Sequence, residues 1–594
     1  MTSESRLEEG GRIDRRQPRA FTFNGRRYGG FAGDTLASAL LANGVMLVAR
    51  SWKYHRPRGV VGAGVEEPNA IVQLETGAYT VPNARATEVP LYEGLTAHSV
   101  NCWPGPEIDF MALAQLFAGL MPPGFYYKTF MWPKRLWRTY EHYIRKASGL
   151  GEAPQVADAS KYDKTNAYCD VLVVGAGPAG LAAALGAGRS GARVIVADEQ
   201  AEFGGSLLSI GSAPLPRIGG QTAGHWLDAA LRELGATPNV RLLPRSTVFG
   251  YHDANYLTIA ERRHDHLPLS ERMGCRERIW RVRARQVVLA TGAIERPLVF
   301  GNNDRPGIML ASAASAYVNR YAVRLASRAV MFTNNDSAYG CALDLARAGI
   351  EVAAIVDCRR SPSGGIVQKV RDAGIEIIDG SVVVNTRGRK RLSAVRVMQM
   401  DGDRLTGKSR HIECGLLAMS GGWSPVVHLH AQSGARPRFD ATQACFVPGQ
   451  AVQGERSAGS CNGTFDLERC LEEGAAAGAQ AAALSGFAAV AANLLAVEAS
   501  APEEQTLEPL WCVPSPRMVG HAPKQFVDFQ NDVSAADIAL AAREGYRSIE
   551  HVKRYTALGF GTDQGKIGNI NGMAILARAL GNEISATGTT TFRP

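Results

Sequence analysis

The chain has 594 residues, of which 45% are hydrophobic and 20% are charged, values typical of globular proteins. This length exceeds what one hydrophobic core supports and predicts about three or four domains. The net charge is +9, but the basic residues are spread out and lack the interleaved aromatic residues of a strand-binding groove. The composition therefore argues against a nucleic-acid partner.

The ten cysteines are scattered and form no Cys-x-x-Cys pair. This arrangement argues against a zinc or iron–sulfur site and against the disulfide framework of a small secreted protein. The first residues are polar, without the apolar core of a signal peptide. No run of about 18 apolar residues is present, and we expect the alanine-rich stretch 474–497 to form a buried helix or helix pair. We therefore expect a cytoplasmic protein without a membrane segment.

The N-terminal quarter predicts a small sheet that packs on one helix. Residues 20–80 alternate in short runs typical of strand, turn, strand, helix and strand, with Asp34 and Thr35 as candidate helix caps and Gly44 as the helix end. Residues 105–150 are rich in aromatic and basic side chains, which indicates helices packed on a neighbouring surface. The polar stretch 152–167 is typical of a linker.

A βαβ pattern follows, and it occurs twice. Residues 170–200 predict a strand, a glycine turn, a helix and a second strand, and residues 329–378 repeat this order. Between the two blocks, residues 245–290 predict antiparallel strands that end in VVLATGA. Two such blocks indicate dinucleotide-type domains in tandem. The last hundred residues predict a mixed, mostly helical region.

The glycine motif of the first block is the strongest chemical signal. Gly175 permits a tight turn, Gly177 lets the backbone approach a pyrophosphate, and Gly180 lets helix and strand pack closely. Asp198 and Glu199 follow the second strand about 20 residues later, where a carboxylate binds ribose hydroxyls. An acidic residue repels a 2′-phosphate, so NAD or FAD is favoured over NADP.

Three further segments extend this pattern. Residues 202–206 (EFGGS) are typical of a loop that curls over the adenosine and phosphates, and residues 289–297 (LATGAIERP) close the nucleotide domain in two-dinucleotide flavoproteins. In the second block, TNNDSAYG (333–340) replaces the glycine fingerprint. Asn334 and Asn335 tolerate a left-handed turn but obstruct a pyrophosphate, so we expect this second domain to be a degenerate scaffold.

A basic segment near the C-terminus is suited to a phosphate, because cations, hydroxyl groups and a glycine turn occur together. Its candidate residues are Lys553, Arg554, Thr556, Thr562, Gln564, Gly565 and Lys566. We expect structural roles for His428 and His430. No Ser-His-Asp, His-Glu-x-x-His or Walker pattern is present, and no catalytic residue is assigned.

Several long segments resemble the α subunit of heterotetrameric sarcosine oxidase, in order and over nearly the whole chain. They are KYHRPRG (53–59), GFYYKTFMWP (124–133), LATGAIERPLVFGNNDRPGIMLASAA (289–314), SGGWSPVVHLHAQSG (420–434), CNGTFDL (461–467), FVDFQND (526–532) and HVKRYTALGFGTDQGK (551–566). The resemblance implies the large subunit of an oxidoreductase that acts on CH–NH groups with oxygen as acceptor. In that family a β subunit carries FAD, FMN lies at the α–β interface, and electrons pass to oxygen to give hydrogen peroxide. The α subunit holds a redox-inert NAD, and zinc belongs to the δ subunit, so β, γ and δ partners are expected and no zinc in this chain.

The resemblance also assigns residues by motif. Those that fall where the family contacts NAD are Ala179, Asp198, Glu199, Gln200 and Ser206, with Val248 on the adenine side and Gly459, Thr464 and Phe465 in a segment that returns to the cofactor. The segment 551–566 would face the FMN phosphate. The N-terminal region resembles the ferredoxin-like β-grasp fold, with VVGAGVEEPN in the position of the cluster loop. Because Cys102 alone cannot supply four ligands, we expect no iron–sulfur cluster and expect the cationic loop 53–58 to dock against another domain or subunit.

The expected fold is α/β and α+β, multidomain, with a β-grasp domain and tandem Rossmann-like domains of the two-dinucleotide flavoprotein type. The predicted parts are a β-grasp domain (1–104), a helical segment and linker (105–168), the first half of the dinucleotide domain (169–300), a degenerate Rossmann-like domain (301–420), a return to the first domain (421–500), a mostly helical FMN- or partner-facing region (501–584) and a stub (585–594). The family continues here with a folate-binding domain that resembles the glycine-cleavage aminomethyltransferase. The sequence leaves open a truncated piece, a split gene or a shortened relative.

Three functions fit these residues. The first is the NAD-holding, non-catalytic subunit of a sarcosine oxidase. The second is an FAD-binding catalytic subunit of a related amine, opine or proline dehydrogenase, since NAD and FAD use the same fingerprint. The third is an assembly scaffold without a cofactor.

Overall fold

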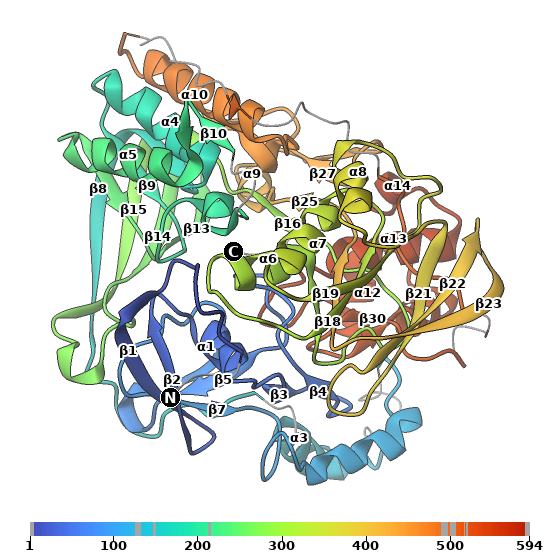
Figure 1. The fold of residues 1–594 in the computed structure, drawn as a ribbon. Helices are drawn as coiled ribbons and strands as arrows, with labels where there is room; N and C mark the ends of the chain where they lie inside the picture. Colours follow the sequence, from blue (N-terminus) through green and yellow to red (C-terminus); the bar gives the residue numbers. More distant parts are fainter. Residues whose placement is uncertain are drawn as a thin grey trace. The chain divides into compact units, whose positions relative to one another are not determined.

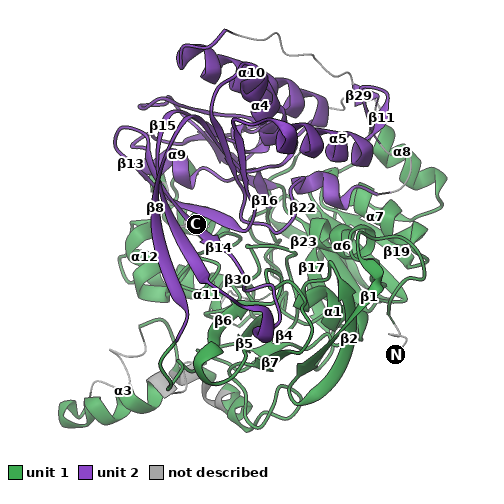
Figure 2. Ribbon diagram, turned by 90° about the vertical axis from the view of Figure 1, so that its left-hand side faces the viewer, with its two compact units in different colours: residues 1–158, 295–422, 505–592 green, residues 159–294, 423–504, 593–594 purple. Residues whose placement is uncertain are grey.

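The computed structural model describes residues 5–124, 132–146, 150–211, 216–488, 497–498, 507–515, 517 and 521–588. The chain forms two compact units, each built from discontinuous segments (Figure 2). Unit 1 comprises residues 1–158, 295–422 and 505–592, and unit 2 comprises residues 159–294, 423–504 and 593–594. Much of the GFYYKTFMWP segment and the end of the predicted 585–594 stub lie outside the described residues.

The N-terminal part of unit 1 is a five-stranded sheet around one helix, which confirms the β-grasp expectation (Figure 1). The strand order is β2-β1-β7-β5-β6, with β1 and β7 parallel and the other neighbours antiparallel. Helix α1 is completely buried and begins with a capping box between Thr35 and Ser38, while Asn43 is its C-cap. The elements are β1 (Asp14–Phe23), β2 (Arg26–Ala32), α1 (Leu36–Ala42), β5 (Ile71–Leu74), β6 (Val81–Arg85) and β7 (Leu95–Ser99).

Unit 2 is built on a sheet of order β12-β9-β8-β15-β14-β13, with β28 beside β15. The strands β12, β9, β8, β15 and β28 are parallel, whereas β14 and β13 are antiparallel. Alternate residues of β8 enter two cores, because Val171 and Val173 pack with the helices and Leu172 and Val174 pack on the other face. The strands are β8 (Lys161–Val174), β9 (Val194–Ala197), β12 (Val240–Leu243), β13 (Ser246–His252), β14 (Tyr256–Arg262), β15 (Cys275–Leu289) and β28 (Glu455–Ser457), and the helices are α4 (Pro178–Arg189), α5 (Ala223–Ala236) and α10 (Leu467–Leu484).

Helix α10 contains residues 474–484 of the alanine-rich stretch. A Cβ atom on Gly474 or Gly478 would lie 2.1 Å from the carbonyl oxygen of Ala179 or Ala183. The small residues therefore let α10 and α4 approach backbone to backbone. The helix ends at Leu484, just before Gly486 with its φ of +92°, and the remainder of the stretch from 489 to 496 lies outside the described residues.

A second parallel sheet lies in unit 1, in the order β17-β24-β18-β19-β20. Helices follow its strands, which confirms the expected tandem Rossmann-like arrangement. An antiparallel sheet β21-β22-β23 accompanies it. The elements are β17 (Ile308–Leu310), α6 (Ala311–Asn319), β18 (Arg328–Thr333), α7 (Ser337–Arg347), β19 (Glu351–Asp357), α8 (Gly365–Asp372), β20 (Ile377–Ile378), β21 (Ser381–Arg387), β22 (Ala394–Asp401), β23 (Arg404–Glu413) and β24 (Leu416–Ser420).

The C-terminal part of unit 1 is mostly helical, as expected. It contains β30 (Phe526–Asp528), β31 (Val533–Ser534), α11 (Ala535–Arg543), α12 (Ile549–Thr556), α13 (Asn569–Leu580) and α14 (Ile584–Thr587). Among the residues that the structure describes, no helix has the length and apolar character needed to cross a bilayer.

The cationic loop 53–58 docks inside unit 1. The Arg56 guanidinium donates to Asp304 from Nε at 2.5 Å and from Nη2 at 2.8 Å. The Arg58 guanidinium bridges Asp304 and Asp532, and the backbone N–H of Tyr54 donates to Asp532 Oδ2 at 2.8 Å. The loop therefore joins the β-grasp domain to segments that are about 250 and 470 residues away in sequence. The expectation that it docks against another domain is confirmed.

The glycine loop that follows is organised by a buried carboxylate. Glu67 Oε2 accepts the backbone N–H groups of Val61 and Gly62, and Oε1 accepts those of Asn69 and Ala70, at 2.6–2.8 Å. Burial raises the pKa of Glu67 to about 7, although the four N–H donors act in the opposite direction. Burial likewise raises the pKa of Glu295 and of Asp563 to about 7.

These three carboxyl groups predict how stability depends on pH. Unfolded carboxyl groups have pKa values near 4, so the folded chain binds the extra protons between about pH 4.5 and pH 7. The free energy of unfolding should therefore fall as the pH rises through this window and level off above about pH 7. Urea unfolding of the wild-type chain between pH 5 and 8 measures this slope.

A Glu67→Gln variant should lower the free energy of unfolding by about 2–3 kcal/mol, because its NH₂ group faces N–H donors. It should also flatten the pH slope. The exposed Glu9→Gln change serves as control. A slope that persists unchanged in Glu67→Gln would contradict the assignment to this residue.

Candidate functional site

The turn after β8 joins a central strand of the unit 2 sheet to α4. Gly175 has a φ of +94°, and a Cβ atom there would lie 2.3 Å from the carbonyl oxygen of Ala290. A Cβ atom on Gly180 would lie 1.9 Å from the carbonyl oxygen of Gly175. These two glycines are therefore required by the fold itself, which brings strand, turn and helix into close approach.

Gly177 is different, because a Cβ atom there would meet the described residues only at ordinary contact distance. The nearest atom to a Cβ there would be the Cα of Gly205, at 3.9 Å. Gly177 is the N-cap residue of α4, which begins with Pro178 and has no side-chain cap. An open helix N-terminus of this kind attracts phosphate groups. The turn therefore fits the pyrophosphate of a dinucleotide.

Asp198 braces this turn. Its Oδ2 atom accepts the backbone N–H of Ala176 at 2.7 Å, and its Oδ1 atom accepts that of Gln200 at 2.8 Å. The carboxylate thus lies beside the glycine turn, as a ribose ligand in this fold does. That Asp198, Glu199 and Gln200 contact a nucleotide stays a prediction.

The loop at 204–206 lies against the open side of the turn. The backbone N–H of Gly204 donates to the carbonyl oxygen of Ala176 at 2.9 Å. A Cβ atom on Gly205, whose φ is +54°, would lie 2.9 Å from the Cα of Gly177. Ser206, the next residue, is exposed in the short 3₁₀ helix Gly205–Ser209, and that its hydroxyl group contacts a phosphate stays a prediction.

The segment 459–464 returns to the same helix end. A Cβ atom on Gly459 would lie 2.7 Å from the Cβ of Ala179, so the two predicted contacts are neighbours. Sequence reasoning missed Glu473, whose carboxylate accepts the backbone N–H of Gly459 at 2.9 Å and the hydroxyl of Thr464. In the sequence, Glu473 lies in LERCLEEG on a predicted helix, where a glutamate is ordinary. Nothing in that pattern indicates a contact with Gly459.

Two other predicted contacts lie farther from the turn. Phe465 stacks near Trp423, with ring centroids 6.5 Å apart. Val248 in β13 is buried in the core cluster that also contains Val174 and Ala197, so it supports the sheet below the ends of β8 and β9. Contacts of Phe465 and Val248 with a nucleotide stay predictions.

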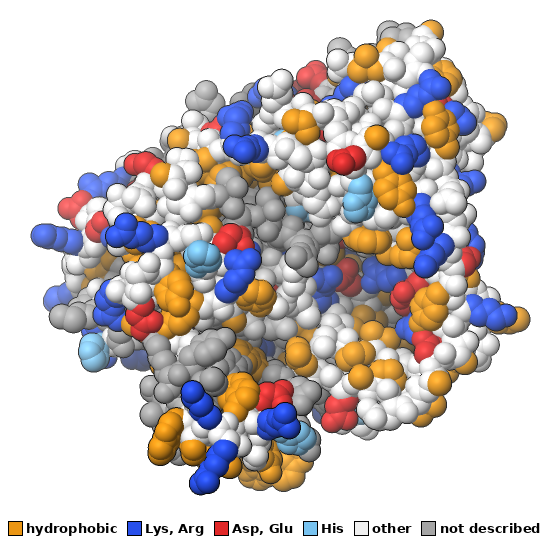
Figure 3. All heavy atoms as spheres, turned by 180° about the vertical axis from the view of Figure 1, so that it is seen from behind, with side chains coloured by type: hydrophobic (Ala, Val, Ile, Leu, Met, Phe, Trp, Pro, Cys, Tyr) orange, Lys and Arg blue, Asp and Glu red, His pale blue; other side chains and the backbone are white. Residues whose placement is uncertain are grey.

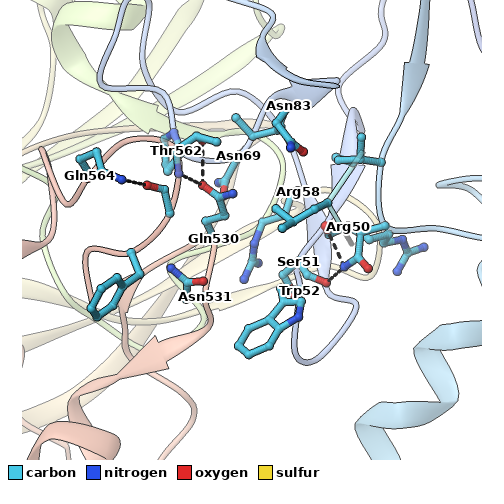
Figure 4. Close-up of a pocket in the computed structure, with 18 residues that line it drawn as sticks. Arg50, Ser51, Trp52, Arg58, Asn69, Asn83, Gln530, Asn531, Thr562 and Gln564 are labelled. Atoms are coloured by element: carbon cyan, nitrogen blue, oxygen red, sulfur yellow. Dashed lines mark hydrogen bonds between the residues drawn. The ribbon is translucent and has the colours of Figure 1, made fainter. Parts of the chain in front are cut away.

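The structure brings two of the predicted FMN-facing residues to a cavity of about 350 Å³ inside unit 1 (Figure 4). The backbone N–H and the hydroxyl of Thr562 both donate to Gln530 Oε1, at 2.7 and 2.8 Å. The side-chain amide of Gln564 donates to the carbonyl oxygen of Gly561 at 2.8 Å. The residues labelled around the cavity are Arg50, Ser51, Trp52, Arg58, Asn69, Asn83, Gln530, Asn531, Thr562 and Gln564.

The other residues of that group do not line the cavity. Lys553 and Arg554 lie on α12, where each is within 4 Å of Glu550, and the Thr556 hydroxyl donates to the carbonyl oxygen of Val552. Gly565 has a φ of +74°, and a Cβ there would meet the Asn569 side chain. Lys566 is buried, with Nζ 3.4 Å from the carbonyl oxygen of Asp563.

At the edge of the second Rossmann-like sheet where a nucleotide would bind, the segment around Glu508 packs against the turn after β18. The backbone N–H of Glu508 donates to the carbonyl oxygen of Asn334 at 3.1 Å, and Asn334 Nδ2 donates to the carbonyl oxygen of Glu508 at 2.9 Å. The guanidinium carbon of the buried Arg296 lies over the Trp511 ring, 5.0 Å from its centroid. These contacts lie at the carboxyl end of β18, the usual ligand edge of such sheets, and agree with the degenerate turn that Asn334 and Asn335 predict.

Three sequence families match parts of the chain. Residues 522–594 match the sarcosine oxidase A3 domain, and residues 169–437 match the pyridine nucleotide-disulphide oxidoreductase family. Residues 16–102 match the 2Fe-2S iron-sulfur cluster binding domain.

The last match corrects the expectation that the chain has no iron–sulfur cluster. That expectation came from cysteine count alone, whereas the match places the whole β-grasp region in a cluster-binding family. Within the matched range the sequence has one cysteine, Cys102, and burial raises the pKa of its thiol to about 11. Clusters of this type take four ligands, mostly thiolates. The side chains of this range alone do not fit that ligand set.

The chain is similar along its length to curated sarcosine oxidase α subunits. It is 45% identical to that of Rhizobium meliloti (strain 1021), over 100% of this chain and 58% of the relative, and 41% identical to that of Corynebacterium sp. (strain P-1), over 98% and 55%. The chain thus spans little more than half the length of these relatives. Among solved structures, L-proline dehydrogenase from P. horikoshii matches with a TM-score of 0.65 at 18% identity, over 100% of this chain and 97% of that one. At that identity the likeness shows a shared fold.

Proposed function

We propose, from the premise that this chain belongs with the α subunits of sarcosine oxidase, that it is the large NAD-binding subunit of such a complex. The complex would oxidise the N-methyl group of sarcosine, which water then releases as formaldehyde to leave glycine, and reduce oxygen to hydrogen peroxide. The supporting observation is the glycine turn of unit 2, where a Cβ atom on Gly177 would have no contact shorter than 3.9 Å, whereas Gly175 and Gly180 are fixed by packing.

The residues of this chain that would hold the nucleotide surround that turn. The α4 N-terminus would bind the pyrophosphate through its backbone N–H groups. Asp198 and Glu199 would face the ribose, whose hydroxyl groups donate to carboxylates. Ala179 and Gly459 would close the far side of the turn, and the NAD bound there would have a structural role.

The flavin chemistry is proposed to belong to partner chains. FAD would be on a β subunit and FMN at the interface with this chain, with γ and δ subunits completing the assembly. The cavity of Figure 4 contains Asn69, whose buried amide oxygen and nitrogen have no partner among the described residues. An unpaired buried amide fits the polar edge of a ligand, which supports a cofactor-facing role for Thr562 and Gln564.

A cytoplasmic location is proposed on the state of the thiols. All ten cysteines of the sequence are free. Unpaired thiols, most of them buried, are typical of a reducing compartment.

The test is the absorption spectrum of the chain purified alone. A colourless protein that releases NAD on denaturation would support the proposal. A yellow protein with a flavin band near roughly 450 nm would instead support a second candidate, an FAD-binding catalytic subunit of an amine, opine or proline dehydrogenase. The shared fold with L-proline dehydrogenase favours that alternative. A colourless protein without nucleotide would contradict both.

The Asp198→Ala variant should weaken NAD binding by about 1–3 kcal/mol, because buried ribose hydroxyl groups and the Ala176 N–H both lose their acceptor. Isothermal titration of nucleotide-free protein with NAD measures this change. Asp228→Ala on α5, at an exposed position, should leave the affinity unchanged. Equal affinities for the wild-type and Asp198→Ala proteins would remove Asp198 from the ribose site.

A further inference from the structure

A group of large apolar side chains is exposed on the segment that follows the N-terminal sheet of unit 1. Most of them belong to the 3₁₀ helix η2 (Phe110–Leu120). Single exposed apolar residues are ordinary, but a cluster of this size marks an interaction surface. The exposed fractions are 65% for Trp103, 64% for Ile108, 57% for Phe110, 41% for Met111, 63% for Leu113 and 79% for Leu116.

This segment is fixed to the rest of unit 1 through its polar atoms. The Asp109 carboxylate contacts His55 Nδ1 at 3.0 Å and accepts the backbone N–H groups of Trp103 and Met111, both at 3.1 Å. The Arg50 guanidinium donates to the carbonyl oxygen of Pro106 at 2.9 and 2.6 Å. The apolar side chains are thus held outward on an anchored backbone, which lowers the entropy cost of binding something there.

A basic helix is the next described helical element along the chain. The short turn η3 (Lys134–Leu136) and helix α3 (Trp137–Lys146) carry Trp132, Leu136 and Tyr143, which are 82%, 40% and 66% exposed. The exposed cations Lys134, Arg135 and Arg138 have no ion pair within the part of the chain that the structure describes. On the lobe that carries α3, Figure 3 shows apolar side chains beside Lys and Arg side chains.

The chemistry of this surface indicates a protein partner with carboxylates. Tryptophan, tyrosine, phenylalanine, methionine and arginine are the residues enriched in protein interfaces. In a complex, Asp or Glu side chains on the partner would complement these exposed cations. A lipid surface fits less well, because the exposed ion pair of Glu107 with Lys390 lies directly beside Ile108 and would have to enter the bilayer interface.

We propose that the described residues of 103–146 form a docking arm for a partner subunit whose surface offers an apolar groove edged by Asp and Glu side chains. This inference depends on the proposed function, in which the chain works in a complex.

The first test is hydroxyl-radical footprinting of the complex purified through a tag on this chain, compared with the chain alone. Met111 and Trp132 should be modified at least about fivefold more slowly in the complex. Met273, which is 84% exposed in unit 2, serves as the internal reference. Mass spectrometry of the same sample identifies the chains that copurify.

The second test changes the arm itself. The double variants Phe110→Ser with Leu116→Ser, and Arg135→Glu with Arg138→Glu, should each lower the affinity for the purified partner at least tenfold. All four side chains are exposed, so the thermal midpoint of the isolated chain should not change. Control variants are Val452→Ser and Arg404→Glu, at exposed positions elsewhere in the chain.

The outcomes separate this inference from the proposed function. Protection of the arm together with weakened assembly of both double variants supports the inference. A complex that forms without protecting Met111 and Trp132 overturns the inference and leaves the proposed function standing. If no complex is recovered at all, the proposed function fails first. Arm-dependent self-association, or arm-dependent binding to vesicles of phosphatidylcholine and phosphatidylglycerol, would assign the surface to a different occupant and overturn the inference.

Discussion

Replacing Asp304 by alanine is expected to lower the free energy of unfolding by about 3–5 kcal/mol. The Asp304 side chain is 1% exposed and receives both Arg56 and Arg58. Without it, two guanidinium groups remain in the interior, and Asp532 compensates only Arg58. A buried cation without its carboxylate costs far more than an exposed ion pair contributes.

Urea unfolding of the Asp304→Ala variant measures this cost, and a double-mutant cycle with Arg56→Met isolates the pair. Asp401→Ala is the matched control, because Asp401 pairs with Arg360 at a site where both side chains are 70% exposed. The control should change the free energy of unfolding by less than about 0.5 kcal/mol. Equal losses in the two variants would show that the docked loop contributes nothing beyond a surface contact.

The same ion pairs predict a second pH effect, opposite in sign to that of Glu67. Burial alone would raise the pKa of Asp304, but Arg56 and Arg58 hold it well below its usual range. The stabilisation is therefore present above the unfolded pKa near 4 and is lost as the pH falls further. Acid unfolding of Asp304→Ala should start from lower stability and show a shallower slope below pH 4.

The spacing of apolar residues along the sequence predicted most of the fold. The runs around residues 20–80 predicted the β-grasp sheet, and the two blocks with βαβ order predicted two parallel sheets, because buried parallel strands need continuous apolar residues. The prediction of a linker over the polar stretch 152–167 is wrong from Lys161 onward. β8 begins at Lys161, well before Asp170, and its first half pairs with β15 from Cys275 onward. Hydrogen bonds to a long neighbouring strand outweigh the weak strand propensity of KYDKTNA.

Contacts over long sequence separations could not be predicted in the same way. The motif KYHRPRG suggested docking, but nothing in it identifies Asp304 or Asp532 as the partners. The turn TNND predicted a degenerate second crevice, yet the placement of Glu508 and Trp511 at that crevice depends on a chain path that local sequence does not encode.

The candidate site shows the same division. The spacing of the glycines predicted close-packing roles for Gly175 and Gly180. In the structure each lies so close to a backbone carbonyl oxygen that only a residue without a Cβ atom fits. Glu473 was missed, because a carboxylate on an alanine-rich helix has no local signature of its contact with Gly459. The composition of 551–566 predicts one phosphate site, but the structure divides its residues, since Thr562 and Gln564 line the cavity and the cations Lys553, Arg554 and Lys566 do not. The composition of a segment shows which side chains are present. It does not show which residues those side chains contact in the folded chain.

The Gly177→Val variant is expected to fold normally and to lose dinucleotide binding completely. The position of Gly177 accepts a Cβ atom, since the nearest atom, the Cα of Gly205, would be 3.9 Å away, an ordinary contact distance. A valine side chain would then occupy the place where the pyrophosphate approaches the α4 N-terminus. The NAD released on denaturation should fall from about one per chain to a level below detection, and the far-ultraviolet circular dichroism should match nucleotide-free wild type.

Valine substitutions of Gly175 and Gly180 are the controls, because they distinguish a damaged fold from a blocked site. Gly175→Val and Gly180→Val should destabilise or unfold unit 2, because their Cβ atoms would lie 2.3 and 1.9 Å from backbone carbonyl oxygens. Loss of nucleotide in those variants would therefore report a damaged fold, whereas loss in Gly177→Val reports a blocked site. A folded Gly177→Val chain that still carries one NAD would place the nucleotide elsewhere and would remove the basis for assigning it to this turn.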